Sequence, residues 1–343
     1  MFKITPLDRS NLAAIQQRID NKTKPPGALG QLESLAKKMA LIQDSDRLSV
    51  TKPHMLVFAA DHGITEEGVS PFPSEVTSQM VMNFVAGGAA INCFCREFDI
   101  KIEVIDAGIK SPLPEHALIK RQRLGAGTAN FCQGPAMTHE QVVQALTYGA
   151  IRVADCHRSG CNVVGLGEMG IGNTSAAAAL MAAFTGLSAE DCVGQGTGLD
   201  DAGVRHKIEV IARALELHQH VFNDPMTILA AVGGFEIAQM AGAMLKAAEL
   251  KMLVLVDGFI ASAAAMAAVT IEPACKDYLI FSHASNEQGH QRMLQHLDVE
   301  PLLNLGLRLG EGSGAALALP LLRAACAFYN DMASFESAGV SQV

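Results

Sequence analysis

The chain has 343 residues, of which 49% are hydrophobic and 18% are charged, with 31 glycines and no tryptophan. This composition is typical of a compact globular enzyme with one large α/β domain or two smaller ones. The formal net charge of −9 argues against a nucleic-acid or anionic-membrane surface, which normally carries a basic patch. Any phosphate must therefore be held by local groups.

The eight cysteines show no paired CxxC spacing, which indicates reduced thiols in a cytoplasmic protein. The N-terminal stretch MFKITPLDRS lacks the apolar core of a signal peptide. The longest apolar run, 258–271, has 14 residues, fewer than the roughly 18 that span a bilayer. We therefore expect a soluble protein with no membrane partner.

In chain order, the first 45 or so residues predict two amphipathic helices separated by the turn Pro25-Pro26-Gly27. Almost continuously apolar runs follow, each ahead of an alanine-rich segment that predicts a helix. These runs cover 54–63, 100–108, 161–170, 252–259 and 278–285. Buried parallel strands have this pattern, and its alternation with helices predicts a sheet covered on both faces. A last helix is expected from about Ser313 to Ser334, and the terminal helices can pack together as a small second subdomain.

In such a sheet, ligands bind beyond the carboxyl ends of the strands. Several polar residues fall at or just after the predicted strand ends and are therefore expected to share one crevice. They are Asp61, His62, Asp106, Glu168, Asp257 and His283.

The segment 61–92 leads from the first strand through a loop rich in glycine and proline into a helix. Ser74 and Gln79 are neutral polar residues among apolar ones, a combination suited to a flat apolar ligand with a few hydrogen-bonding atoms. A helix N-cap at Ser74 with a methionine core behind it is the alternative. The histidines show no HxxxH or HExxH spacing, so no metal site is expected.

The segment GLGEMGIGNTSAAAAL (165–180) is the richest in motifs. Its G-x-G-x-x-G spacing matches the dinucleotide fingerprint and half-matches a P-loop, but the P-loop lysine position is Asn173 and no acidic residue ends a following strand. Glycines let a ligand approach the backbone, and the helix that begins at 173–175 offers free N–H groups to an anion. A turn that serves helix packing alone is the alternative.

The segment GQGTGLDDAGVRHK (194–207) is a second loop of this kind. Gly196 and Gly198 give it flexibility, and Lys207 follows as a point charge, which suits a single phosphate. The pair Asp200-Asp201 resembles that of phosphoribosyltransferases that use a pyrophosphorylated ribose with magnesium, but no TxxT phosphate loop follows. Asp201 can instead cap the helix.

The segment RLGEGSGAALALPLLRAA (308–325) places Glu311 between glycines in an otherwise apolar stretch. A carboxylate taken out of water is either kept wet by a loop or held with a raised pKa.

Together, these segments resemble the nicotinate-nucleotide:dimethylbenzimidazole phosphoribosyltransferases, which make the lower-ligand nucleotide of cobalamin. The matching stretches run in the family's order over nearly the whole chain. They are FAADHGITEEGVSPFPSEVTSQMV, GLGEMGIGNTS, GTGLDDAGVRHK, VGGFEIAQMAGAML, VDGFIASAAA, SHASNEQGH and LNLGLRLGEGSGAALALPLL.

The resemblance implies transfer of phosphoribose from nicotinate mononucleotide to 5,6-dimethylbenzimidazole with inversion at C1′, giving α-ribazole 5′-phosphate and nicotinate. It implies a Rossmann-like domain over 46–312 and a small helical domain built from 1–45 and 313–343. It also implies a homodimer that needs no metal or other cofactor.

The family's functional residues carry over onto matching positions. Glu311 corresponds to the catalytic glutamate, Lys207 to the phosphate-binding lysine, Glu168 to the loop carboxylate, Ser74 to the serine that lines the base pocket, and Gln79 is expected beside it. The remaining substrate-binding residues are expected to be Met169, Gly170, Gly172, Asn173, Thr174, Ser175, Gly196, Gly198 and Leu309.

The implied chemistry needs a base, since a benzimidazole nitrogen that carries its proton is a poor nucleophile. We expect Glu311 to take that proton, with its pKa raised by an apolar wall that includes Leu309. Glu168 is expected to stabilise the charge that develops on the ribose or to hold its hydroxyls. Two alternatives stay open: a dinucleotide-dependent oxidoreductase and a non-catalytic sensor of corrinoid precursors. The choice among dimethylbenzimidazole, adenine, benzimidazole and phenolic acceptors also stays open.

Overall fold

A computed structural model describes residues 2–196 and 198–341. Its centre is one sheet of six parallel strands in the order β3-β2-β1-β4-β5-β6. The strands are β1 (His54–Ala60), β2 (Lys101–Gly108), β3 (Ile119–Arg121), β4 (Val163–Met169), β5 (Leu253–Val256) and β6 (Leu279–Phe281). This is the Rossmann strand order, so the predicted fold class is confirmed.

The predicted strands all appear, and each is shorter than its apolar run. All seven residues of β1 are buried, as strands covered on both faces should be. The last residues of the runs, such as Asp61 and Asp257, leave the sheet and enter loops. The short edge strand β3 was not predicted, because its sequence IKR is half exposed and carries no strand pattern.

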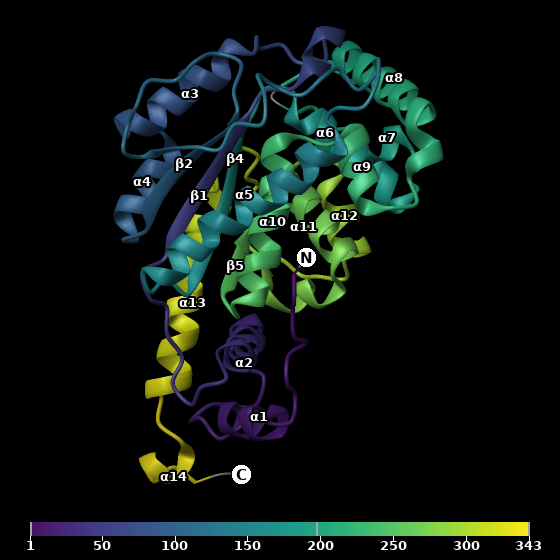
Figure 1. Cartoon of the computed structure of the whole chain (residues 1–343). Helices are drawn as coiled ribbons and strands as arrows, with labels where there is room; N and C mark the ends of the chain where they lie inside the picture. The colour runs from purple at the N-terminus through teal and green to yellow at the C-terminus, as the bar shows by residue number, and fades with distance from the viewer. Residues whose placement is uncertain (1, 197, 342–343) are drawn as a thin grey trace.

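Helices cover both faces of the sheet (Figure 1). On one face α10 (Phe235–Glu249) packs against β1, β2, β4 and β5, with α5 (His139–Arg158) and α11 (Phe259–Ile271) beside it. On the other face lie α3 (Glu75–Ala86), α4 (Ala90–Glu97) and α13 (Ser313–Asp331). The remaining α-helices of the described residues are α1 (Leu12–Asp20), α2 (Gln31–Gln43), α6 (Asn173–Thr185), α7 (Ala189–Cys192), α8 (Asp201–His218), α9 (Pro225–Val232), α12 (His290–His296) and α14 (Phe335–Ala338).

Segments near the two ends of the chain lie together below the sheet, where α1 and α2 lie beside the lower part of α13 (Figure 1). The Arg18 guanidinium stacks on the Tyr329 ring at 4.3 Å, and the backbone of Lys22 pairs with that of Ser334. Helix α13 also contacts β4 and β5, so it joins this region to the sheet. The division into 1–45, 46–312 and 313–343 stays a prediction, and its last two residues lie outside the described part of the chain.

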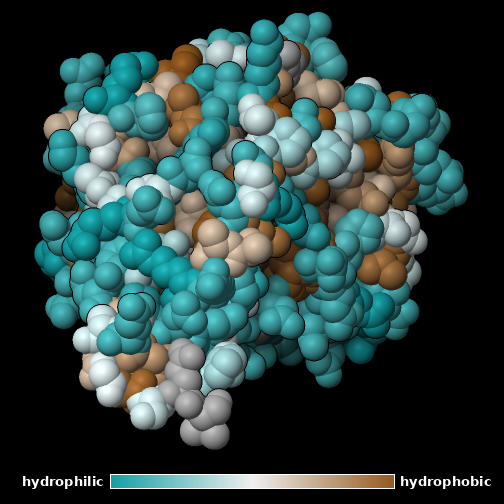
Figure 2. Space-filling model, turned by 90° about the horizontal axis from the view of Figure 1, so that it is seen from below, coloured by the Kyte–Doolittle hydropathy of each residue, from teal (hydrophilic) through white to brown (hydrophobic). Residues whose placement is uncertain are grey.

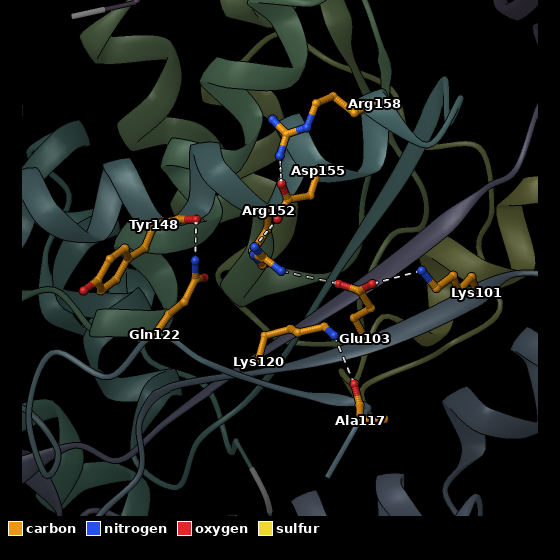
Figure 3. A network of polar contacts seen from close by, with 9 residues as sticks. All are labelled: Lys101, Glu103, Ala117, Lys120, Gln122, Tyr148, Arg152, Asp155 and Arg158. Carbon is orange, nitrogen blue, oxygen red and sulfur yellow. Dashed lines mark hydrogen bonds and ion pairs between the residues drawn. The ribbon is translucent and has the colours of Figure 1, made fainter. Parts of the chain in front are cut away.

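A network of charged side chains ties the start of β2, which extends beyond its pairing with the edge strand β3, to α5 (Figure 3). Glu103 lies between Lys101 at 3.1 Å and Arg152 at 4.0 Å, and Arg152 and Arg158 both pair with Asp155. Charges at the edge of a sheet discourage pairing with another chain. We therefore assign this network a structural role.

From the side of the terminal helices the surface is largely hydrophilic, and apolar residues show in small separate groups (Figure 2). No helix of the described residues is long and apolar enough to cross a bilayer. All eight cysteines are free thiols.

Candidate active site

A cavity lies beyond the carboxyl ends of β4, β5 and β6. It holds about 650 Å³ of empty space, part of it open to solvent. Its wall is formed by the turn after β4, the start of α6, Gly196, the start of α11, the segment after β6 and the loop before α13. The lining residues are Glu168–Ile171, Asn173, Thr174, Gly196, Asp257–Ala261, His283, Ser285, Glu287 and Arg308–Gly310.

Glu168, near the end of β4, is one of the buried acids of the cavity. Its carboxylate accepts a hydrogen bond from the Asn173 side-chain amide and lies so close to Gly310 that a methyl group there would overlap it. Burial, and next to it the charges of Asp257 and Glu236, raise the pKa of Glu168 to about 8, although the Asn173 bond opposes the shift. Protonated and ionised Glu168 are therefore both accessible near neutral pH.

Asp257, at the end of β5, holds the turn before α13. Its carboxylate accepts hydrogen bonds from the N–H groups of Gly312 at 3.2 Å, Gly314 at 2.7 Å and Ala315 at 3.0 Å. A carboxylate here satisfies the free N–H groups at the start of a helix. Burial nevertheless raises the pKa of Asp257 to about 7.

Glu311 lies in this turn with a φ of +63°, a conformation that non-glycine residues rarely adopt. Its carboxylate is buried and accepts a hydrogen bond from the Ile91 N–H at the start of α4, at 3.3 Å. Burial raises the pKa of Glu311, and the bond from Ile91 lowers it in part. The sequence left two possibilities for Glu311, a solvated position in a loop or a buried position with a raised pKa, and the structure shows the second.

Glu311 faces the side of the sheet that carries α4 and is not among the residues that line the cavity. Leu309 does line it, with 57% of its surface exposed. The Gly310 backbone connects the two residues and also touches Glu168. The turn 309–311 thus carries Glu311, one of the two predicted catalytic acids, and forms part of the cavity wall beside the other, Glu168.

The glycines of the 165–170 motif serve this turn. Gly165 and Gly167 lie inside β4, where the dinucleotide fingerprint would require a loop after the strand. A methyl group at Gly167 would overlap the Glu311 carbonyl, and one at Gly165 would meet the end of the Met55 side chain. Both glycines therefore let the 310–312 turn and α13 approach the sheet.

Lys207, on α8, forms the cationic end of the site. Its buried Nζ donates to Thr174 Oγ1 at 2.7 Å and would be 3.3 Å from a methyl group at Gly196. Burial lowers the pKa of Lys207 to about 8, and the nearby Glu287 carboxylate opposes that shift. The ammonium form therefore predominates at neutral pH.

The first turn of α6 lies beside this lysine. Gly172, with a φ of +96°, precedes the helix, and Asn173 and Thr174 face the cavity. Ser175 is buried one residue further along, and its hydroxyl has no hydrogen-bond partner among the described residues. Backbone N–H groups at a helix start and a buried ammonium together form a site suited to a phosphate.

The predicted site residues divide into three groups. Glu168, Met169, Gly170, Asn173, Thr174, Gly196 and Leu309 line the cavity. Gly172, Ser175 and Lys207 lie directly behind its wall. Gly198, with a φ of +113°, lies in the loop before α8 but is not among the lining residues, and Thr197 is outside the described residues.

The two predicted base-pocket residues lie on α3, away from this cavity. Ser74 precedes the helix, is half-buried, and has its Oγ 3.4 Å from Thr65 Oγ1, with no N-cap bond from its side chain. Gln79 is exposed. Instead, the buried Thr77 links α3 to the site, because its Oγ1 accepts from the Ile171 N–H at 3.1 Å. The roles of Ser74 and Gln79 stay predictions.

Of the strand-end residues expected to share one crevice, Glu168, Asp257 and His283 line the cavity. Burial lowers the pKa of His283 to about 4, so it is neutral. Asp61 and Asp106 bind backbone N–H groups of Lys110 and Ile109 instead. The sequence analysis did not identify four further residues that line the cavity, namely Phe259, Ser285, Glu287 and Arg308. Their distance along the chain from a predicted strand end was the only feature of the sequence that could have indicated them.

The cavity therefore combines a cationic end at Lys207 with two acids, Glu168 and Asp257, whose pKa values lie near neutral and which a nearby positive charge would ionise. Such a distribution suits a ligand that carries an anionic group at one end and positive charge at its centre.

A family model described as "Phosphoribosyltransferase" matches residues 4–340. The chain is 60% identical to the nicotinate-nucleotide–dimethylbenzimidazole phosphoribosyltransferase of Photobacterium profundum, over 99% of this chain and 100% of that protein. It is 56% identical to the protein of the same name from Shewanella sediminis, over 99% of each chain. The crystal structure of CobT from Thermus thermophilus matches with a TM-score of 0.93 at 43% identity, over 97% of this chain and 99% of that one. The resemblance predicted from the motifs is thus confirmed, and this chain belongs to the nicotinate-nucleotide–dimethylbenzimidazole phosphoribosyltransferase family.

Proposed function

We propose that this enzyme transfers phosphoribose from nicotinate mononucleotide to 5,6-dimethylbenzimidazole in cobalamin biosynthesis, with inversion at C1′. The products are α-ribazole 5′-phosphate and nicotinate. One observation carries the proposal: the wall of a single cavity includes the start of α6, with the buried Lys207 ammonium bonded to Thr174 behind it, and the buried Glu168 carboxylate. The full-length identity to proteins named for this reaction supports it.

The 5′-phosphate binds at the start of α6. The start of the helix supplies a positive potential and the Lys207 ammonium supplies charge and hydrogen bonds, since the N–H groups of Asn173 and Ser175 already donate to the Gly170 and Gly172 carbonyls. Because Lys207 is already held by Thr174 at 2.7 Å, little side-chain entropy is lost when the phosphate arrives. This contact fixes the ribose in the cavity.

Glu168 acts on the ribose. As the bond from C1′ to the nicotinate nitrogen breaks, its electron pair goes to that nitrogen and the sugar becomes positively charged. An ionised carboxylate beside the ring stabilises this charge. The quaternary ring nitrogen of the bound nucleotide is itself positive, so substrate binding lowers the raised pKa of Glu168 and favours its ionised form.

Glu311, which faces α4 on the far side of the 309–311 turn from the cavity, acts as the general base for an acceptor that binds on that side of the turn. A benzimidazole nitrogen forms the new bond to C1′ from the face opposite the leaving nicotinate, and the N–H proton goes to the Glu311 carboxylate. Its raised pKa makes it a better proton acceptor than an exposed glutamate. Attack from the opposite face converts the β- to the α-glycosidic bond.

A direct assay tests the reaction. The enzyme is mixed with nicotinate mononucleotide and dimethylbenzimidazole, and α-ribazole 5′-phosphate is measured by mass spectrometry, with proton NMR of the anomeric position. No product would overturn the proposed reaction, and a β-configured product would overturn the inversion. Parallel reactions with adenine, benzimidazole and a phenol give the order of acceptor preference.

The two alternatives are tested with the same protein. A dinucleotide-dependent oxidoreductase would bind NADH tightly in a fluorescence titration, whereas we expect no saturable binding, since Gly165 and Gly167 lie inside a strand. A sensor of corrinoid precursors would bind the ligands without turnover.

We further propose that the enzyme is a cytoplasmic homodimer, as the resemblance implies. Light scattering during size-exclusion chromatography should give about twice the chain mass of 36.2 kDa. A species with the mass of one chain would contradict the dimer.

A further inference from the structure

Beneath the turn that follows Glu168 lies a buried, hydrogen-bonded pair of side chains that the reaction described above does not use. His62 Nε2, just after β1, is 2.7 Å from Glu236 Oε1 in the first turn of α10, and both side chains are 0% exposed. His62 Nδ1 and Glu236 Oε2 have no hydrogen-bond partner among the described residues.

Stability alone gives little reason for such a pair. Two charged or polar groups lose their hydration when they are buried, and their mutual attraction rarely exceeds this cost. Replacing a buried pair by apolar side chains of similar volume is often neutral or stabilising. Its position next to a site with perturbed acids therefore indicates a functional role.

The pair contacts the site through the turn 170–173. A methyl group on Gly170 would be 3.4 Å from both His62 Nε2 and Asn173 Nδ2, so both nitrogens lie close to the same backbone atom. Asn173 Nδ2 in turn donates to Glu168. A methyl group on Gly172 would be 3.2 Å from His62 Cβ, so the imidazole supports both ends of the turn.

We infer that His62, held by Glu236, is a positioning residue for Glu168: it supports the turn 170–173 from beneath and so fixes the Asn173 amide that holds the Glu168 carboxylate, while the Glu236 charge acts on the same carboxylate. This inference rests on the proposed role of Glu168 in stabilising the ribose. Small displacements matter in such a site, since an error of about 1 Å in a positioned group lowers turnover by roughly a hundredfold.

Glu236 also acts on Glu168 by charge. The groups that face Glu168 are Asp257 at the end of β5, Glu236 on α10, Glu311 before α13 and the neutral Asn173 amide on α6, with His62 beyond Asn173 on the β1 side. Removal of the Glu236 charge lowers the pKa of Glu168, so the ionised form appears at lower pH.

Variants of the pair separate positioning from stability. The double variant His62→Leu/Glu236→Leu leaves no unpaired buried charge, so we expect a melting temperature close to that of the wild type and a kcat about 10- to 100-fold lower. In His62→Gln the amide still donates to Glu236, and we expect kcat within about threefold of the wild type. A double variant that is folded and has wild-type kcat and KM would overturn the inference.

The pH profile gives a readout that a purely structural role would not move. With Glu236→Gln, which keeps the hydrogen bond to His62, the rising limb of kcat/KM should shift down by about one pH unit. The matched control is Glu33→Gln, which removes the charge from the buried Lys24–Glu33 pair of 2.8 Å, outside the site, and should leave the profile unchanged. An unshifted profile for Glu236→Gln contradicts the inference even where the apolar double variant does not fold.

Carbon-13 NMR titration of the glutamate carboxylates, with Glu168 assigned by Glu168→Gln, repeats the test without turnover. A lower pKa of Glu168 in Glu236→Gln supports the inference, and an unchanged pKa overturns it. If the wild-type enzyme makes no α-ribazole 5′-phosphate, the proposed reaction fails, while this titration still decides whether the pair acts on Glu168.

Discussion

The substitution Gly167→Ala tests whether strand β4 sets the position of Glu311. The added methyl group would lie 2.6 Å from the Gly312 nitrogen, whereas carbon and nitrogen atoms normally pack no closer than about 3.5 Å. The turn 310–312 must therefore move by roughly 0.9 Å, because the neighbour is backbone and cannot rotate away. We expect the free energy of unfolding to fall by about 1–3 kcal/mol and kcat to fall by about a hundredfold.

Gly165→Ala is the matched control, since Gly165 lies two residues earlier in the same strand and faces the same side. Its methyl group would meet the Met55 side chain and lie 3.4 Å from the Ala315 Cβ atom. The end of a methionine side chain can rotate, so we expect kcat within about threefold of the wild type. Product formation is measured by mass spectrometry and stability by urea denaturation. A folded Gly167→Ala enzyme with wild-type turnover would refute the proposed dependence of catalysis on this close approach.

The remaining predictions concern the charged groups of the site. Glu311→Gln should keep the fold and lower kcat by at least about a hundredfold; near-normal turnover in a stopped assay would remove Glu311 from the mechanism. Lys207→Met should weaken nicotinate mononucleotide binding by about 10- to 100-fold, and calorimetry that gives an unchanged affinity would contradict the phosphate site. The stability of Glu168→Gln relative to the wild type should increase as pH rises from about 4.5 to about 8. The fold raises the pKa of Glu168 to about 8. In this window the folded wild type holds a proton that the unfolded chain has lost, so the wild type loses stability as pH rises and the variant does not. If urea denaturation gave the two proteins equal free energies of unfolding at pH 9 as well as at pH 5, the raised pKa of Glu168 would be contradicted.

The fold could be predicted because its strands carry a pattern that only burial on both faces produces. The runs around β1, β2, β4, β5 and β6 are almost continuously apolar, and each precedes a helix. Strand β3 could not be predicted, since Ile119–Arg121 forms a strand only through pairing with β2. The predicted runs were longer than the strands because they included the polar and glycine residues that follow each strand, such as 61–63 after β1, where the backbone has already left the sheet.

The site could be predicted in part from the position of polar residues along the chain. The strand-end rule brought Glu168, Asp257 and His283 together, and each of them lines the cavity. It could not indicate that Glu311 faces Ile91 on α4, because this depends on the left-handed turn and on the close packing against Gly167. Such contacts form only in the folded protein. Their only trace in the sequence is the glycines that make close packing possible, and a dinucleotide fingerprint accounts for the same glycines equally well.

In the proposed mechanism, the acids of the site lower stability and support catalysis for the same physical reason. Burial raises the pKa values of both Glu168 and Asp257, and the Asp257 charge raises that of Glu168 further. A cation placed between them reverses this balance, since it supplies the attraction that the empty site lacks. A ribose that gains positive charge during transfer is such a cation, so the unfavourable charge of the free enzyme becomes stabilisation of the transition state. Lys207 must then lie at the phosphate end, because an ammonium beside Glu168 would neutralise the acid and remove the stabilisation that the reaction requires.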